Sequence, residues 1–125
     1  MRVLLLEDDD LVRGLTARTL RVLGHEVLDA ASVADAERHL DTPPPFVDVL
    51  FADVRLGGSS DGAAYAAAAL DRQPGLRVIL TSGDPSTLAA AASDPRVRVL
   101  PKPYRKEHLR LALEALSDHS AAGDT

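Results

Sequence analysis

Three short polar patches hold the residues of this sequence that could do chemistry. They are the acidic run at residues 7–10, Asp53 and Lys102. The patches follow runs of mainly apolar residues at 3–6, 47–52 and 97–100. Such runs predict buried strands of a parallel sheet, whose carboxyl ends meet at one edge. Carboxylates and an ammonium group gathered there indicate a site for a divalent cation and a phosphate group.

Strand and helix patterns alternate along the chain. Further apolar runs predict strands at residues 27–30 and 77–80. Apolar residues at helical spacing predict helices near 11–23, 32–40, 63–72, 87–93 and 109–116. Five strand–helix units are too few for an eight-unit barrel. The sequence therefore predicts an α/β fold, a doubly wound five-stranded parallel sheet with five helices, which binds ligands beyond the carboxyl ends of its strands.

Length and composition exclude several other classes of protein. The 125 residues suit one domain, expected at 1–117, with a flexible C-terminal tail at 118–125. Cysteine is absent, and 14 basic against 19 acidic residues give a net charge of −5, which disfavours direct binding to nucleic acid. The apolar runs are too short to cross a membrane, and the N-terminus lacks a signal-peptide pattern. We therefore expect a cytoplasmic protein without membrane contact.

Four motifs, each at the end of a predicted strand, together resemble one known family. They are Leu6-Glu7-Asp8-Asp9, Asp53-Val54-Arg55-Leu56 followed by Asp61-Gly62, Thr81-Ser82-Gly83, and Leu100-Pro101-Lys102-Pro103-Tyr104. One of these motifs alone is weak evidence. All four in this order resemble the receiver (phosphoacceptor) domain of two-component response regulators, from Arg2 to about Leu116. The resemblance implies a flavodoxin-like sheet with strand order 2-1-3-4-5.

The resemblance also implies roles for individual acidic residues. Asp53 would be the phosphoacceptor. A Mg²⁺ site would be formed by Asp53, Glu7, Asp8 and the backbone carbonyl of Arg55. In this site Asp8 would bind the ion directly and Glu7 through water. The chemistry of these groups fits, because a carboxylate can form an aspartyl phosphate and Mg²⁺ takes one or two carboxylates with waters and phosphate oxygens.

Two residues would contact the phosphoryl group itself. The resemblance implies that Ser82 bonds one phosphoryl oxygen and that Lys102 pairs with another. It also implies a cis peptide bond between Lys102 and Pro103. Val99 departs from the family, because many receivers have an aromatic residue at this position. A switch based on rotation of an aromatic ring there cannot operate in this chain.

The implied function is that of a stand-alone response regulator in bacterial two-component or phosphorelay signalling. A sensor histidine kinase or a phosphotransfer protein would phosphorylate Asp53 in a Mg²⁺-dependent reaction. A surface conformational change would then carry the signal to an unknown downstream protein. The protein would not be an enzyme, apart from slow self-catalysed phosphorylation and dephosphorylation. Output, and any homodimer, would use the face formed by the fourth helix, fifth strand and fifth helix.

Other interpretations stay open. A phosphatase of the haloacid dehalogenase type also uses an Asp nucleophile after a parallel strand, but it needs a second Asp two residues later, where this chain has Arg55. A receiver-like scaffold that works without phosphorylation, or a phosphate shuttle or sink, would keep the same fold. Taken singly, Asp10 is best explained as an acid favoured at a helix N-terminus, and Asp61-Gly62 as a turn only.

Overall fold

The computed structural model describes residues 1–41, 47–56, 61–84, 86 and 94–123. Its strands are β1 (Arg2–Leu6), β2 (Glu26–Ala30), β3 (Val49–Asp53), β4 (Arg77–Ser82) and β5 (Val97–Pro101). Its helices are α1 (Asp10–Val22), α2 (Val33–Asp41), α3 (Gly62–Arg72) and α5 (Lys106–Gly123). The strands pair in parallel in the order β2-β1-β3-β4-β5. The predicted doubly wound sheet and its strand order are confirmed.

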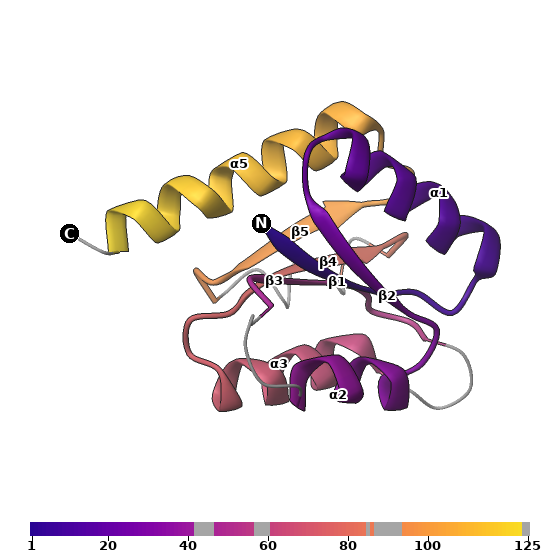
Figure 1. Cartoon of the computed structure of the whole chain (residues 1–125), viewed down its shortest axis with the longest axis horizontal. Coiled ribbons are helices and arrows are strands. Elements are labelled where there is room, and N and C mark those ends of the chain that lie inside the picture. Colours follow the sequence, from indigo (N-terminus) through magenta and orange to yellow (C-terminus); the bar gives the residue numbers. More distant parts are fainter. Residues whose placement is uncertain (42–46, 57–60, 85, 87–93, 124–125) are drawn as a thin grey trace.

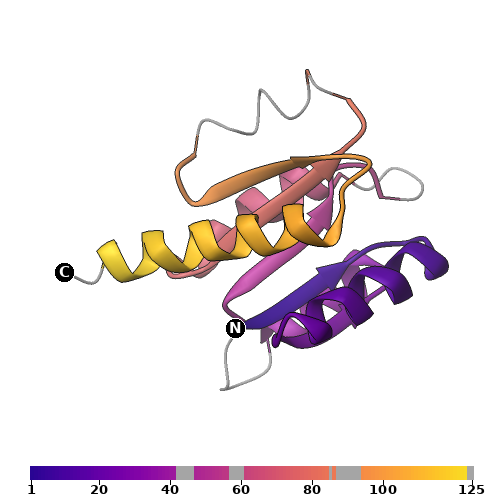
Figure 2. The same cartoon turned by 90° about the horizontal axis from the view of Figure 1, so that it is seen from above.

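The sheet lies between two layers of helices. Figure 1 shows α1 and α5 on one face of the sheet, and α2 and α3 on the other. In both Figure 1 and the view from above in Figure 2, β1 and β5 run toward the same side of the molecule, where α1 and α5 begin. The carboxyl ends of the parallel strands therefore form one edge, which we call the site edge.

Side chains of the strands alternate between the two layers. In β3, Leu50 and Ala52 belong to the core under α2 and α3, whereas Val49 and Phe51 belong to the core under α1 and α5. None of these four residues is more than 2 % exposed. Burial on both faces explains why the strands are continuous apolar runs rather than alternating ones.

The first helix forms where predicted, but three of its large apolar residues are exposed. Leu11, Leu15 and Val22 are 72, 57 and 64 % exposed. The buried residues of α1 are instead Thr16, Ala17 and Leu20. Two of these residues, Thr16 and Ala17, are small, and Leu20 is the large apolar residue of the inner face. The three exposed residues, which we call the outer stripe, lie on one face because they are spaced by four and seven positions.

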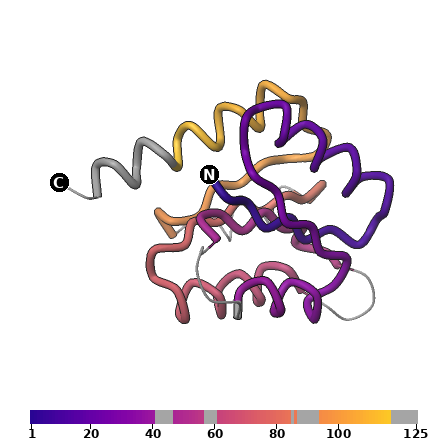
Figure 3. Tube along the Cα trace, in the orientation of Figure 1, coloured from indigo at the N-terminus to yellow at the C-terminus, as the bar shows by residue number. Residues whose placement is uncertain are grey.

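The number of helices differs from expectation. The described residues form four helices rather than the five expected, and the predicted fourth helix at 87–93 lies outside the described part of the chain. The face proposed for output therefore lies partly outside it too. The last helix reaches Gly123, and the division into a domain at 1–117 and a flexible tail at 118–125 stays a prediction. Figure 3 shows the trace of α5 on the same face of the sheet as α1.

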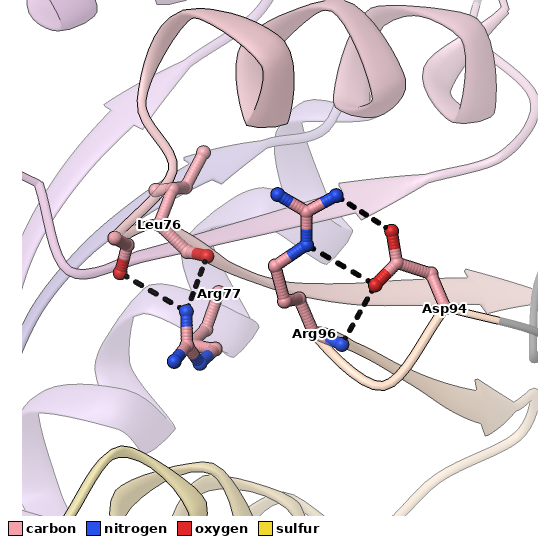
Figure 4. Close-up of polar contacts among 5 residues, drawn as sticks. Leu76, Arg77, Asp94 and Arg96 are labelled. Atoms are coloured by element: carbon pink, nitrogen blue, oxygen red, sulfur yellow. Dashed lines mark hydrogen bonds and ion pairs between the residues drawn. The ribbon is translucent and has the colours of Figure 1, made fainter. Parts of the chain in front are cut away.

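Two arginines order the turns that lead into β4 and β5 (Figure 4). Arg77 Nη1 donates to the backbone carbonyl of Leu76 at 3.0 Å. The Arg96 guanidinium pairs with the Asp94 carboxylate, with Nη2 to Oδ2 at 2.9 Å, and the backbone N–H of Arg96 donates to Oδ1 at 2.9 Å. These contacts lie at the opposite ends of the strands from the site edge. They order the turns from which β4 and β5 start.

Candidate functional site

The site edge gathers most of the buried polar residues in the described part of the chain. Among the described residues, the buried polar or charged ones are Glu7, Thr16, Asp53, Thr81 and Ser82. All except Thr16 lie at the carboxyl end of β1, β3 or β4. The register places Asp53 beside Thr81, and Ser82 beside Pro101, the residue before Lys102. Burying polar groups costs free energy, so their concentration at one edge indicates a site and not a part of the core.

The Asp53 carboxylate contacts two groups. Its Oδ1 accepts a hydrogen bond from the backbone N–H of Arg55 at 2.9 Å, and its Oδ2 forms a short ion pair with the Lys102 ammonium. Partial burial disfavours the charged form of Lys102. The hydrogen bond to Asp53 and the charges of Asp53 and Glu7 outweigh that effect and raise the pKa of the ammonium. The Lys102–Pro103 bond is cis, as predicted.

Glu7 is the buried acid of the β1–α1 loop. It is 6 % exposed, and its pKa is raised by burial and by the charges of Asp53 and Asp8, against the lowering effect of Lys102. Asp8 is exposed. The acids of β1 and β3 thus share one electrostatic environment, as expected for strand ends that meet at an edge.

Arg13 orders this acidic loop, a role that the sequence did not indicate. Its Nη1 donates to the backbone carbonyl of Glu7 at 3.0 Å, and its Nη2 pairs with Asp10 at 2.6 Å. Asp9 caps the helix by accepting from the backbone N–H of Val12 at 3.0 Å. One arginine inside a helix carries no motif that would predict these contacts. Asp10 is near the helix N-terminus, as expected for an acid favoured there.

Gly62 approaches the backbone of Asp53 more closely than any side chain would allow. A Cβ atom built on Gly62 would lie 1.9 Å from the Asp53 carbonyl oxygen. The Gly62 N–H donates to the carbonyl of Val54 at 2.8 Å, and Asp61 forms an antiparallel bridge with Arg55. The Asp61-Gly62 pair is thus more than the turn that the sequence suggested, because it packs against the strand end that bears Asp53.

Ser82 lies at the end of β4, 4 % exposed. Its Oγ accepts a hydrogen bond from the backbone N–H of Asp84 at 3.0 Å. The backbone N–H of Lys102 donates to the Ser82 carbonyl at 3.0 Å. The ends of β4 and β5 are therefore linked directly, which sets the spacing between Ser82 and Lys102.

The oxygen ligands of the predicted Mg²⁺ site suit a small hard cation but do not enclose one. No three His, Cys, Asp or Glu side chains of the described residues form a group that could hold a metal ion. Mg²⁺ needs less, because one or two carboxylates completed by waters and phosphate oxygens suffice. Glu7 is near enough to Asp8 and Asp53 to interact with them electrostatically. The Arg55 carbonyl completes the predicted set of four groups. These residues fit the ion in donor chemistry.

Replacing Glu7 by Gln should stabilise the metal-free protein at neutral pH. Because the pKa of Glu7 is raised above its ordinary 4.5, the folded protein binds more protons than the unfolded chain between that value and the raised pKa. The free energy of unfolding of the wild type therefore falls as the pH rises through this window. The Glu7→Gln variant does not lose this stability, because Gln does not ionise. Urea titrations in EDTA should show the gain of Glu7→Gln at pH 7 and its disappearance below pH 4.5. A gain that persists at low pH would contradict this account.

An apolar groove adjoins the site. Its volume is about 560 Å³, and it lies between α1 and the segment that joins β5 to α5. Its lining includes Val12 and Leu15 from α1, and Lys102, Arg105 and Lys106 from the other side. Lys102 thus lines the groove and also contacts Asp53. A molecule bound in the groove would lie beside the site edge.

The protein has a doubly wound α/β fold, in which a parallel sheet lies between two layers of helices. Its candidate site lies at the site edge. The chain matches the response regulator receiver domain over residues 3–114, and it belongs to that family. No curated protein matches it. None of the helices in the described part of the chain is long and apolar enough to cross a membrane.

Solved structures agree with the family assignment. The receiver domain of the hybrid histidine kinase CckA is 30 % identical, with a TM-score of 0.74, covering 93 % of this chain and 99 % of that one. A receiver domain protein from Clostridium thermocellum is 21 % identical, with a TM-score of 0.84 and coverage of 97 and 98 %. The signal receiver domain of an HD domain-containing protein from Pseudomonas fluorescens Pf-5 is 24 % identical, with a TM-score of 0.83 and 97 % coverage of both chains. The last two support the fold alone.

Proposed function

We propose that this receiver domain accepts a phosphoryl group on Asp53 from a sensor histidine kinase or a phosphotransfer protein, in the cytoplasm and with Mg²⁺ as cofactor. The observation that carries the proposal is the contact of Asp53 with Lys102 at an edge that also holds Glu7 and Ser82. We propose Ser82 and Lys102 as ligands of the phosphoryl oxygens. Glu7, Asp8, Asp53 and the Arg55 carbonyl are the proposed ligands of the ion.

The proposed reaction transfers one phosphoryl group. A carboxylate oxygen of Asp53 forms a bond to phosphorus while the bond from phosphorus to the donor nitrogen breaks, and the donor histidine leaves as neutral imidazole after taking up a proton. The product is an acyl phosphate on Asp53. Bound Mg²⁺ would neutralise charge on the transferred group. Lys102, released from Asp53, would pair with a phosphoryl oxygen, and this keeps its charge compensated.

The donor protein would dock on α1. The outer stripe of Leu11, Leu15 and Val22 exposes apolar side chains along one helix face, with spacing that suits packing against another helix. Leu15 also lines the groove, and the opposite rim has the basic residues Arg105 and Lys106. An apolar helix flanked by acidic residues would complement both features. A donor bound there reaches the site edge without crossing either helical layer.

The experiment that tests the proposal is intact-mass analysis after treatment with acetyl phosphate. The protein should gain one phosphate in Mg²⁺, and labelling should be lost in EDTA. Because small donors react poorly with some receivers, the reaction is run in parallel with a phosphorylated histidine kinase. Absence of labelling with both donors would favour a scaffold that works without phosphorylation.

The two loop acids should differ in their effect on Mg²⁺ binding. Asp8→Asn removes a proposed direct ligand, whereas Glu7→Gln removes one that acts through water, so Asp8→Asn should weaken binding more. We expect about tenfold or more for Asp8→Asn, within the range for loss of a residue that supports a metal ion. NMR titration with Mg²⁺ measures both. Equal or reversed losses would mean that the two acids have exchanged roles.

A further inference from the structure

Of the buried polar residues that the structure describes, one lies away from the site edge. Thr16 belongs to the inner face of α1 and is 5 % exposed. Its Oγ1 is 3.0 Å from the Tyr104 hydroxyl oxygen, and the two groups share a hydrogen bond. A buried hydroxyl is costly unless it is bonded, so this contact determines how both side chains lie.

Tyr104 joins the three segments that carry the site. It is two residues after Lys102 in the chain. Its ring contacts Phe51 edge-to-face, with centroids 5.9 Å apart and planes at 71°, and Phe51 is two residues before Asp53 in β3. Through Thr16 it also reaches α1, which begins after the acidic loop. No other side chain described above contacts all three segments.

We propose that Tyr104, held by its hydrogen bond to Thr16, is a positioning residue that keeps the Lys102 ammonium beside Asp53. Lys102 needs such support, because its long side chain is 31 % exposed and loses rotamer freedom when it pairs with Asp53. Packing of the Tyr104 ring on Phe51 fixes how far the segment that carries Lys102 lies from β3. The hydrogen bond of the Tyr104 hydroxyl fixes the orientation of this segment relative to α1. The inference rests on the proposed function, since it concerns how fast Asp53 is phosphorylated.

Three substitutions separate the hydroxyl contact from the rest of the fold. Tyr104→Phe keeps the ring on Phe51 and removes the bond, and Thr16→Val removes the same bond from the other side. Each should slow labelling of Asp53 by acetyl phosphate roughly three- to tenfold, the range for loss of one hydrogen bond. Thr16→Ser keeps the hydroxyl and should restore most of the rate. Equal rates in Thr16→Val and Thr16→Ser would overturn the proposal.

A second measurement tests whether the effect passes through Lys102. In a Lys102→Met background, Tyr104→Phe should not slow labelling further, whereas a purely structural role would slow it equally in both backgrounds. NMR relaxation of the Lys102 side-chain methylenes in the unphosphorylated protein should show greater mobility in Tyr104→Phe and Thr16→Val. Unchanged mobility in both variants would overturn the proposal. This readout needs no labelling, so a wild-type protein that accepts no phosphate would refute the proposed function and still leave the positioning role to be judged.

Discussion

Asp53→Asn should abolish phosphorylation by any donor. The amide that replaces the carboxylate has no oxygen able to form an acyl phosphate, and it also removes the anionic partner of Lys102 at the site edge. Intact-mass analysis after acetyl phosphate treatment should therefore find no added phosphate, where the wild type gains one. The expected effect is a complete loss and not a fractional one.

Asp29→Asn is a matched control for this experiment. Asp29 is an exposed carboxylate in β2, a strand of the same sheet, and it is not among the proposed site residues. The Asp29→Asn variant should be labelled as fast as the wild type. That result would show that removal of one negative charge does not itself cause the loss of labelling in Asp53→Asn. Full labelling of Asp53→Asn, or loss of labelling in Asp29→Asn, would refute the assignment of Asp53.

Gly62→Ala should damage both stability and phosphorylation. The new Cβ would lie 1.9 Å from the Asp53 carbonyl oxygen and 2.9 Å from its carbonyl carbon, so backbone must move. Overpacking of this kind costs about 1–3 kcal/mol of unfolding free energy. A displacement of Asp53 by about 1 Å can slow a reaction roughly a hundredfold. Urea denaturation followed by circular dichroism measures the first effect, and the rate of labelling measures the second.

Gly14→Ala supplies the opposite control. Gly14 lies in α1, and a Cβ there would have nothing within 4 Å. The substitution should stabilise the protein by roughly 0.5–1 kcal/mol, because alanine has the higher helix propensity. Labelling with acetyl phosphate should be unchanged. If Gly62→Ala matched Gly14→Ala in stability and rate, the close approach of Gly62 to Asp53 would have no functional weight.

The sheet and its edge were predictable because both follow from short-range patterns. Apolar runs at 3–6 and 47–52 identify strands, and parallel pairing alone brings Glu7 and Asp53 together. The orientation of α1 was not predictable in this way. Its two possible buried faces have similar periodicity, and the choice between them depends on how the helix packs on the sheet. Periodicity in the sequence does not determine how the helix packs on the sheet.

The contacts that support the site were also not predictable from the sequence. Asp61-Gly62 looks like a turn from its residue types alone, and only the folded loop brings Gly62 against Asp53. The bond between Thr16 and Tyr104 joins residues 88 positions apart. Such contacts arise from packing between layers, which no local pattern encodes. Local patterns indicate residue types that are capable of chemistry, but they do not indicate the residues that hold those groups in place.

The inward face of α1 has a consequence for the lifetime of the protein in a cell. Leu20 is the only large apolar residue among those that α1 buries, whereas α5 buries Leu109, Leu113 and Leu116. A partner that covers Leu11, Leu15 and Val22 would add apolar contacts to a helix that has few. Because a ligand that binds only the folded state shifts the unfolding equilibrium by mass action, such a partner would also protect the chain from proteolysis. The steady-state amount of the regulator would then follow the abundance of its partner.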